Sequence, residues 1–304
     1  MWIALGFIQS TYNPGETMED IGGRYFDTLV KKSFFDKYDN YYKMHDLLHE
    51  LAQSVSAQEC FRIEGENELT YSIPETIRHL AINSNNFELF KNIGKFKNLH
   101  SLHLTFNEDD QDFVDVLNKI FETLRTIRLL CINNQHLKSI PEGIGHLRHL
   151  RYLKIARTSV AQLPRSLSNL YHLMFIIYDK GGLCICKDFL PMNLNNLFNL
   201  RYLKLPWDVI HGMHAIGKLK SLQGLDGFYV KNKIGYKIGE LEHMNDLRHL
   251  RIKLLENVKD AEEACSAKIY QKRDLMDLSL EWNHIYVNDW GLIRPCSMPD
   301  KSRK

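Results

Sequence analysis

The sequence lacks several features that would assign it to a special class of protein. No run of about 18 or more apolar residues occurs, so no membrane-spanning helix is predicted. The apolar start, residues 1–8, has neither a basic region before it nor a small-residue cleavage site, so we expect no signal peptide. The six cysteines form no C-x-x-C pair, which favours free thiols in a reducing compartment. We therefore expect a cytoplasmic location.

The composition is that of an ordinary folded protein, with an uneven distribution of charge. Of the 304 residues, 44% are hydrophobic and 25% are charged, which excludes a disordered or collagen-like chain. Residues 1–76 contain 6 Lys and Arg against 13 Asp and Glu, whereas residues 77–304 contain 33 against 24. An acidic part and a basic part therefore share one chain.

A leucine pattern repeats along most of the chain. The motif L-x-x-L-x-L, with Ile allowed, recurs nine times at spacings of 22 to 28 residues, which is the period of leucine-rich repeats. The third copy is interpreted as Leu124-Ile127-Leu129. The nine copies begin at Ile77, Leu99, Leu124, Leu150, Leu173, Leu200, Leu222, Leu247 and Leu275.

Alternation within each motif predicts a strand with one buried face. In the fourth copy, Leu153 and Ile155 should face inward, whereas Tyr152 and Lys154 should face outward. Prolines in segments 140–144 and 163–167 indicate an irregular or short helical return after the strand. We predict an α/β leucine-rich-repeat solenoid with parallel strands on its concave face.

The outward strand positions are rich in basic side chains. They form a basic stripe with interspersed aromatic rings on the concave face, and an acidic protein surface is the partner that such a stripe favours. The candidate partner-binding residues are Arg125, Arg128, Arg151, Tyr152, Lys154, Arg201, Tyr202, Lys204, Arg248 and Arg251.

Residues 1–60 carry no leucine repeat and have a different pattern. Gly22-Gly23 is expected to separate a short helix before it from a helical face at residues 25–30. A polar turn between aromatic pairs predicts a hairpin within residues 33–42, and the apolar spacing at residues 44–55 predicts a helix. Helices around one hairpin suggest a small winged-helix-like α subdomain.

Three segments of this region carry a family resemblance: Trp2–Ile8, Tyr25–Phe35 and Lys43–Ala52. Together with Leu150–Leu153 and Leu163-Pro164, they resemble plant disease-resistance proteins of the nucleotide-binding leucine-rich-repeat class, coiled-coil type. The resemblance implies four parts: residues 1–60 as the winged-helix end of the nucleotide-binding region, 61–76 as a linker, 77–283 as the repeats and 284–304 as an irregular tail.

The same resemblance implies a role for Met44-His45-Asp46. In that family this motif lies beside the bound nucleotide, so His45 would contact the β-phosphate of ADP and Asp46 would hold the loop. ADP or ATP is implied by the family only, and we expect none on this chain alone because the phosphate-binding loop is absent. The chain is therefore expected to be a non-enzyme, truncated at both ends, from a family of slow ATPase switches.

The function implied by the resemblance is that of an immune-receptor fragment. Its repeats would recognise a pathogen effector or a modified host protein. The basic stripe itself leads to a further hypothesis, that it docks on the acidic N-terminal subdomain or on the receptor's own nucleotide-binding domain and so holds the receptor inactive. The alternative is a leucine-rich-repeat scaffold or decoy without a switch. Nucleic acid is not an expected partner, because the candidate helix at residues 44–55 carries Asp46 and Glu50. A zinc site at His45 and His49 is disfavoured because no clear third ligand follows.

Overall fold

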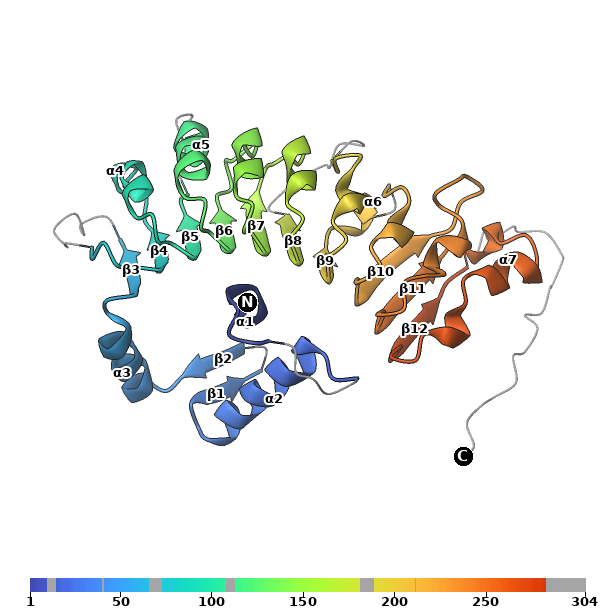
Figure 1. The fold of residues 1–304 in the computed structure, drawn as a ribbon, viewed down its shortest axis with the longest axis horizontal. Helices are drawn as coiled ribbons and strands as arrows, with labels where there is room; N and C mark the ends of the chain where they lie inside the picture. Colours follow the sequence, from blue (N-terminus) through green and yellow to red (C-terminus); the bar gives the residue numbers. More distant parts are fainter. Residues whose placement is uncertain are drawn as a thin grey trace.

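The protein is a curved solenoid with a small N-terminal subdomain on its concave side (Figure 1). The computed structural model describes residues 1–9, 15–39, 41–65, 73–107, 113–180, 189–210 and 212–282. The two parts touch along the middle of the solenoid, where the first helix lies against the sheet (Figure 1).

One parallel sheet runs along the concave face of the solenoid, as the sequence predicts. Its ten strands follow one another in chain order, and every pair is parallel. The strands are β3 Cys60–Glu64, β4 His79–Asn83, β5 Ser101–Thr105, β6 Leu129–Asn133, β7 Tyr152–Thr158, β8 Phe175–Lys180, β9 Tyr202–Lys204, β10 Gly224–Tyr229, β11 His249–Lys253 and β12 Asp277–Leu280.

Short helices form the convex side. Pro141 and Pro164 stand directly before the 3-10 helices η3 and η4, which confirms the predicted short helical returns. The α-helices of this part are α4 Glu88–Lys91, α5 Phe113–Thr123, α6 Trp207–Ile210 and α7 Ala261–Ser266. The 3-10 helices are η2 Ile93–Lys95, η3 Glu142–His146, η4 Arg165–Asn169, η5 Leu194–Asn196, η6 Ile216–Lys218, η7 Ile238–Leu241, η8 Leu255–Asn257 and η9 Ile269–Gln271.

A single hydrophobic core runs through the repeats. Leu153 and Ile155 belong to it and are at most 1% exposed, which confirms the predicted inward positions. Aromatic rings replace leucines near the first repeats, where Phe106 stacks on Phe113 and Phe90 meets both rings edge to face. Each repeat therefore buries its apolar stripe only against its neighbours.

The predicted register of the third repeat is wrong. Leu130 pairs with Leu102 of the previous strand and enters the core, whereas Leu129 pairs with Ser101 and faces the concave side. The repeat is therefore Ile127-Leu130-Ile132. The pattern fails here because Leu129 is apolar although it lies on the concave face. On that face the N-terminal helix buries it.

Strand β3 extends the sheet into the segment interpreted as a linker. All five of its residues pair with β4, and Ile63 is 1% exposed within the solenoid core. No leucine motif marks this strand, so the leucine pattern predicts a sheet that begins one strand later than the observed one.

The described residues of the N-terminal subdomain form three helices and a hairpin. The predicted hairpin is confirmed, and the predicted helix at residues 44–55 corresponds to α3. The elements are α1 Trp2–Leu5, α2 Met18–Lys31, β1 Phe35–Tyr38, β2 Tyr41–Met44 and α3 Asp46–Ser56.

The prediction that Gly22-Gly23 separates two elements is wrong, because α2 runs through both glycines. A capping box stabilises its start: Asp20 donates its backbone N–H to Thr17 Oγ1 at 3.3 Å, and Thr17 donates its own N–H to Asp20 at 3.0 Å. This cap and the apolar face of α2 outweigh the cost of two helical glycines.

Candidate functional site

A row of basic residues crosses the concave side at the start of the strands. The residue before each strand accepts a hydrogen bond at its backbone C=O from the corresponding N–H of the next repeat, at 2.7 to 2.9 Å. These contacts stack one residue per repeat into what we call the arginine ladder. Its members are Arg78, His100, Arg128, Arg151, Met174, Arg201, Gln223, Arg248 and Met276.

The structure places nine of the ten candidate partner-binding residues on the concave side. Four belong to the arginine ladder, and Tyr152, Lys154, Tyr202, Lys204 and Arg251 lie on the strands themselves. Arg125 does not belong to this surface. It lies in the turn after α5 and donates its Nε–H to the Glu122 carbonyl at 3.4 Å. The sequence places it on the concave face only because the predicted register of this repeat is wrong.

The first helix covers an apolar part of this surface. Ala4 is fully buried against Leu129 and Tyr152, with Phe175 and Ile177 packed around them. We call these four solenoid residues the apolar patch. Burial raises the pKa of the Tyr152 hydroxyl to about 12, so this ring stays uncharged under the first helix.

The end of α1 lies directly on the arginine ladder. Arg128 donates an Nη1–H to the Leu5 carbonyl at 3.2 Å. Gly6 follows with a φ of +88°, the left-handed conformation that ends a short helix. The helix therefore ends where it meets the basic row, and Phe7 after it still lies 6.5 Å from the His79 ring, centroid to centroid.

A second contact joins the start of α2 to the ladder. Arg201 donates from Nε and Nη2 to the two carboxylate oxygens of Glu19, at 2.7 and 2.6 Å. Gln223 donates a third hydrogen bond to Glu19 at 3.1 Å. The Arg201 and Glu19 side chains are only 17% and 25% exposed, so this pair is shielded from solvent.

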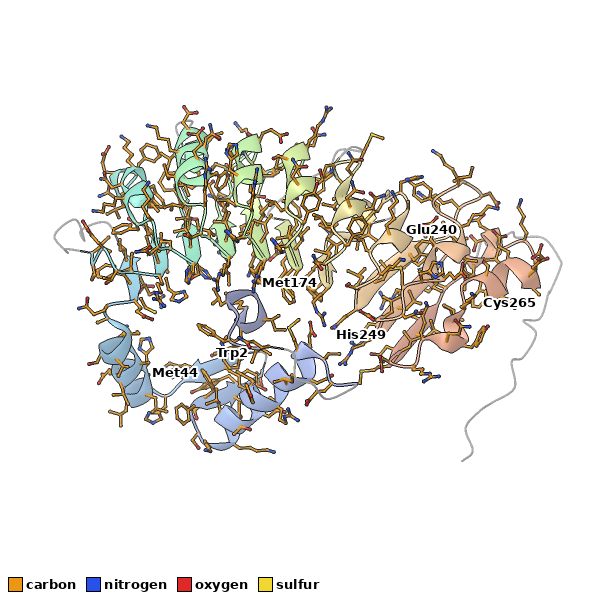
Figure 2. The ribbon with its side chains drawn as sticks, in the orientation of Figure 1. Trp2, Met44, Met174, Glu240, His249 and Cys265 are labelled. Atoms are coloured by element: carbon orange, nitrogen blue, oxygen red, sulfur yellow. The ribbon has the colours of Figure 1, made fainter. Side chains whose placement is uncertain are left out.

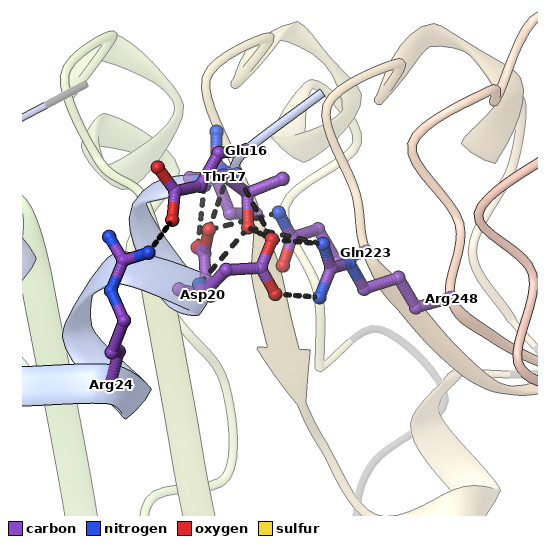
Figure 3. Close-up of polar contacts among 8 residues, drawn as sticks. Glu16, Thr17, Asp20, Arg24, Gln223 and Arg248 are labelled. Atoms are coloured by element: carbon purple, nitrogen blue, oxygen red, sulfur yellow. Dashed lines mark hydrogen bonds and ion pairs between the residues drawn. The ribbon is translucent and has the colours of Figure 1, made fainter. Parts of the chain in front are cut away.

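The next arginine of the ladder also binds both oxygens of one carboxylate. Arg248 donates from Nη1 and Nη2 to the carboxylate of Asp20, at 2.8 and 2.7 Å, and Nη2 also reaches Thr17 Oγ1 at 3.2 Å (Figure 3). We call this set of six residues the carboxylate clamp: Thr17, Glu19, Asp20, Arg201, Gln223 and Arg248.

Electrostatics favours the ionised form of the clamp. Burial on its own would raise the pKa of Glu19, but the hydrogen bonds and charge of Arg201 outweigh burial and lower it. The bonds from Arg248 and Thr17 hold the pKa of Asp20 far below its usual range. Both carboxylates are therefore charged at neutral pH, and the acidic subdomain meets the basic solenoid through them.

Beyond the clamp, the concave side carries charges of both signs. Arg251 lies 3.3 Å from Asp226 and 3.5 Å from Glu281, and His249 lies 2.6 Å from Asp277. His249 is labelled on this side of the solenoid in Figure 2. The predicted basic stripe is thus balanced at its C-terminal end by acidic neighbours that the leucine pattern does not reveal.

Met44, His45 and Asp46 lie at the junction of β2 and α3, within the N-terminal subdomain (Figure 2). Met44 is half-buried, whereas His45 and Asp46 are exposed. Lys43 binds the Asp46 carboxylate at 3.0 Å, and this contact lowers the pKa of Asp46. His45 stands at the N-cap of α3, so its ring and the first N–H groups of the helix share one exposed end.

Other chemical motifs in the sequence have structural explanations. Residues 212–219 come close to the phosphate-binding pattern G-x-x-x-x-G-K-[ST], with Leu219 in place of Ser or Thr. This segment contains η6, where a Cβ on Gly217 would lie 2.1 Å from the Glu240 carbonyl oxygen. Gly217 therefore permits close packing of neighbouring repeats. Among the described residues no group of histidines, cysteines and carboxylates is arranged to hold a metal ion. Cys184 and Cys186 lie outside the described residues.

Comparison with known families matches both parts of the chain. A model of the leucine-rich repeat region matches residues 76–299, and a model of the disease resistance protein winged helix domain matches residues 1–52. The chain belongs to the plant disease-resistance family of leucine-rich-repeat proteins.

Two plant relatives agree with this assignment. A disease resistance protein of Arabidopsis thaliana is 33% identical over 93% of this chain and 20% of its own length, and an RPP13-like disease resistance protein of the same plant is 31% identical over 93% and 27%. The chain thus spans about a fifth to a quarter of these relatives. A Listeria monocytogenes internalin aligns with a TM-score of 0.42 and 15% identity over 67% of this chain and 54% of its own.

The sequence did not reveal the acidic half of the clamp. Thr17, Glu19 and Asp20 are 182 to 231 positions from their partners, so no local spacing brings them together. The available signal was the T-x-x-D capping box directly before an apolar helical face, which predicts a helix start carrying two adjacent carboxylates.

Proposed function

We propose that this chain acts as the sensing part of a cytoplasmic plant immune receptor, in which the solenoid restrains the winged-helix subdomain until a ligand arrives. The supporting observation is the carboxylate clamp, in which two ladder arginines each bind one carboxylate of α2 through two hydrogen bonds. Such bidentate pairs fix orientation as well as supply energy. The role is therefore regulation and binding rather than catalysis.

The subdomain is the element that such a receptor would switch. In the full-length family the Met-His-Asp motif faces ADP or ATP, and the exposed N-terminal end of α3 suits a phosphate. Helix N–H groups and His45 can donate to phosphate oxygens, and Lys43 adds positive charge next to Asp46. A nucleotide bound at His45 and a restraint at Glu19 would then act on the same small subdomain.

The ligand of the receptor is proposed to be a pathogen effector or a modified host protein. The solenoid supplies a broad concave surface for such a partner, and repeat proteins use surfaces of this kind for protein recognition. Tyr202 and Lys204 lie beside the clamp on β9 and are exposed, so a ligand can touch them while the clamp is closed.

The test is constitutive activity in plant cells. A chimaera should carry residues 1–282 in place of the corresponding segment of the Arabidopsis RPP13-like relative. Arg201→Glu and Glu19→Arg should each cause cell death without any pathogen ligand, because each leaves like charges facing one another. The combined charge swap should restore the ion pair, and cell death without a ligand should no longer occur.

Lys204→Glu is the matched control, since it reverses an exposed basic residue on the same concave surface, and among the described residues Lys204 forms no hydrogen bond or ion pair with the subdomain. If Arg201→Glu stays quiet, or if the swap is as active as the single variants, the restraint is refuted. The chain would then be better described as a non-switching scaffold or decoy.

A further inference from the structure

The contact that closes the subdomain has two chemically different halves. The first is the apolar patch of Leu129, Tyr152, Phe175 and Ile177, on which Ala4 is fully buried. The second is the basic half of the clamp, Arg201, Gln223 and Arg248, three consecutive members of the arginine ladder. The solenoid thus presents an apolar area beside a row of donors, and its own N-terminal segment supplies the matching groups.

The donor half selects for carboxylates. Arg201 and Arg248 each present a planar pair of N–H groups, and each pair meets both oxygens of one carboxylate. Gln223 adds a further N–H toward Glu19, so all three side chains donate. Two adjacent residues of one helix satisfy them, so the ligand needs neighbouring carboxylates at a helix start.

The apolar half selects for a small side chain on a short helical turn. Ala4 has no room for solvent between itself and the sheet. At the same place Arg128 donates a hydrogen bond to the Leu5 carbonyl, one of the last carbonyls of α1 that has no partner within the helix. A turn that ends over Arg128 can therefore pack against the patch and satisfy the ladder at the same time.

Leaving this surface uncovered costs free energy, so binding of a replacement partner is favoured. Release of the subdomain exposes the apolar patch to water and leaves Arg201 and Arg248 without their carboxylates. A ligand that offers the same groups covers the apolar patch again and gives the two arginines new carboxylate partners. An apolar ligand without carboxylates would cover the patch but leave the arginines without partners. A ligand that brings carboxylates but no apolar turn would do the reverse.

We infer that the partner which opens this receptor carries a short apolar helical turn followed by a helix that starts with two adjacent carboxylates, and that it replaces α1 and the start of α2 on the concave face. This inference rests on the proposed function, because it names the partner class for the surface that holds the subdomain. The ligand imitates the protein's own N-terminal segment.

The direct test is peptide binding to a vacated surface. The receiver is the whole chain carrying Ala4→Glu, Glu19→Arg and Asp20→Arg, which should detach the subdomain, and circular dichroism verifies that the solenoid stays folded. The probe is a synthetic peptide with the sequence of residues 1–24, and the matched control is the same peptide with Glu19→Gln and Asp20→Asn. Calorimetry should give at least tenfold tighter binding for the acidic peptide, and this advantage should shrink in high salt.

A second receiver keeps the result interpretable if the first one misfolds. The chain with Arg201→Glu and Arg248→Glu should reject the acidic peptide and bind a peptide in which Glu19 and Asp20 are both replaced by Arg. A third peptide, which keeps only the apolar turn and the carboxylate pair and has its other positions changed, should still bind the first receiver.

Equal binding of the acidic and amide peptides would overturn the inference. It would also be overturned if the vacated chain forms dimers that the acidic peptide does not dissociate, since the occupant would then be a second copy. The cell-death assay is independent: activity of Arg201→Glu without peptide binding leaves the restraint standing and removes this inference, and the reverse result keeps the binding surface but removes the restraint.

Discussion

The solenoid and the N-terminal subdomain differ sharply in how they are stabilised. The solenoid has one continuous core from Ile63 to Ala267, whereas in the described part of residues 1–60 the buried hydrophobic side chains are Ala4, Ile8 and Ile21. Of these, Ala4 is buried by the solenoid itself. The repeats are thus self-sufficient, while the subdomain depends on its contacts with other surfaces.

Helix α3 shows the same dependence. Its apolar residues Leu47, Leu51 and Val55 are 71%, 58% and 79% exposed, and no residue of the helix is buried. A helix with an apolar stripe gains little stability unless that stripe is covered. Few contacts within the subdomain would therefore oppose a change of its partner surface.

The largest predicted effect separates the two cores. Leu153→Ala, in the middle of the solenoid, should lower the free energy of unfolding by about 2–5 kcal/mol, because it leaves a cavity in a close-packed core. Leu51→Ala on α3 should change it by less than about 0.5 kcal/mol. Urea unfolding followed by circular dichroism measures both, and similar losses would contradict the comparison.

The second prediction concerns the charges that join the two regions. Replacing Glu19 with Gln and Asp20 with Asn should weaken docking by about 1–3 kcal/mol, the range for losing hydrogen bonds to charged groups, with the more exposed Asp20 contributing less. Small-angle X-ray scattering should show a larger radius of gyration. Asp277→Asn, which removes a carboxylate distant from the clamp, is the control and should leave the radius unchanged.

Acid should have the same effect as these amides. The pKa values of Glu19 and Asp20 are lowered in the docked state, so docking is at full strength above their ordinary values of 4.5 and 3.8 and is lost as the pH falls through the lowered values. In the amide variant the radius of gyration should no longer respond to this titration. An unchanged response would show that other groups cause it.

The third prediction uses two glycines of the subdomain. Gly6→Ala should destabilise docking by about 1 kcal/mol, because its φ of +88° is strained for alanine. Gly23→Ala should stabilise α2 by about 0.4–1 kcal/mol, because a Cβ there meets no atom within 4 Å. Thermal unfolding of the two variants should therefore shift in opposite directions, and shifts of the same sign would contradict the assigned backbone roles.

The smallest predicted effect is a pH dependence within the first repeats. Burial lowers the pKa values of His79, His100 and His103, and Arg128, Arg78 and Lys154 add to this effect. The unfolded chain therefore binds more protons below pH 6.5, and stability should fall as the pH drops through that value. Glu59 opposes the shift at His79 and His100.

The measurement is the urea midpoint at pH 7.5 and 5.5. Replacing the three histidines with Gln should reduce the difference between the two pH values. His172, exposed in the turn between η4 and β8, is the control, and its replacement by Gln should leave the difference as it was. An equal difference in the triple variant would refute the assignment.

The sequence predicted those parts of the fold that depend on local spacing. Leu153, Ile155, Pro141 and Pro164 fall where the repeat pattern places them, because each position has the same role in every turn of the solenoid. The register at Leu129 was mispredicted because an apolar residue on the concave face looks like a core residue until its cover is known.

The candidate site was predicted only in part. The repeat spacing located Arg128, Arg151, Arg201 and Arg248 on one face, since equivalent positions of successive repeats lie side by side. The acidic partners of Arg201 and Arg248 come from α2, at least 182 positions away, and only the folded chain brings these groups together. Local pattern therefore identified a surface, and tertiary structure identified what covers it.

The most direct test of the central claim is the charge swap at Glu19 and Arg201, followed by small-angle X-ray scattering of the whole chain. Arg201→Glu and Glu19→Arg should each enlarge the radius of gyration, and the chain carrying both changes should return to the compact value. If the single variants stay as compact as the unaltered protein, or if the swap stays expanded, the carboxylate clamp does not hold the subdomain on the solenoid.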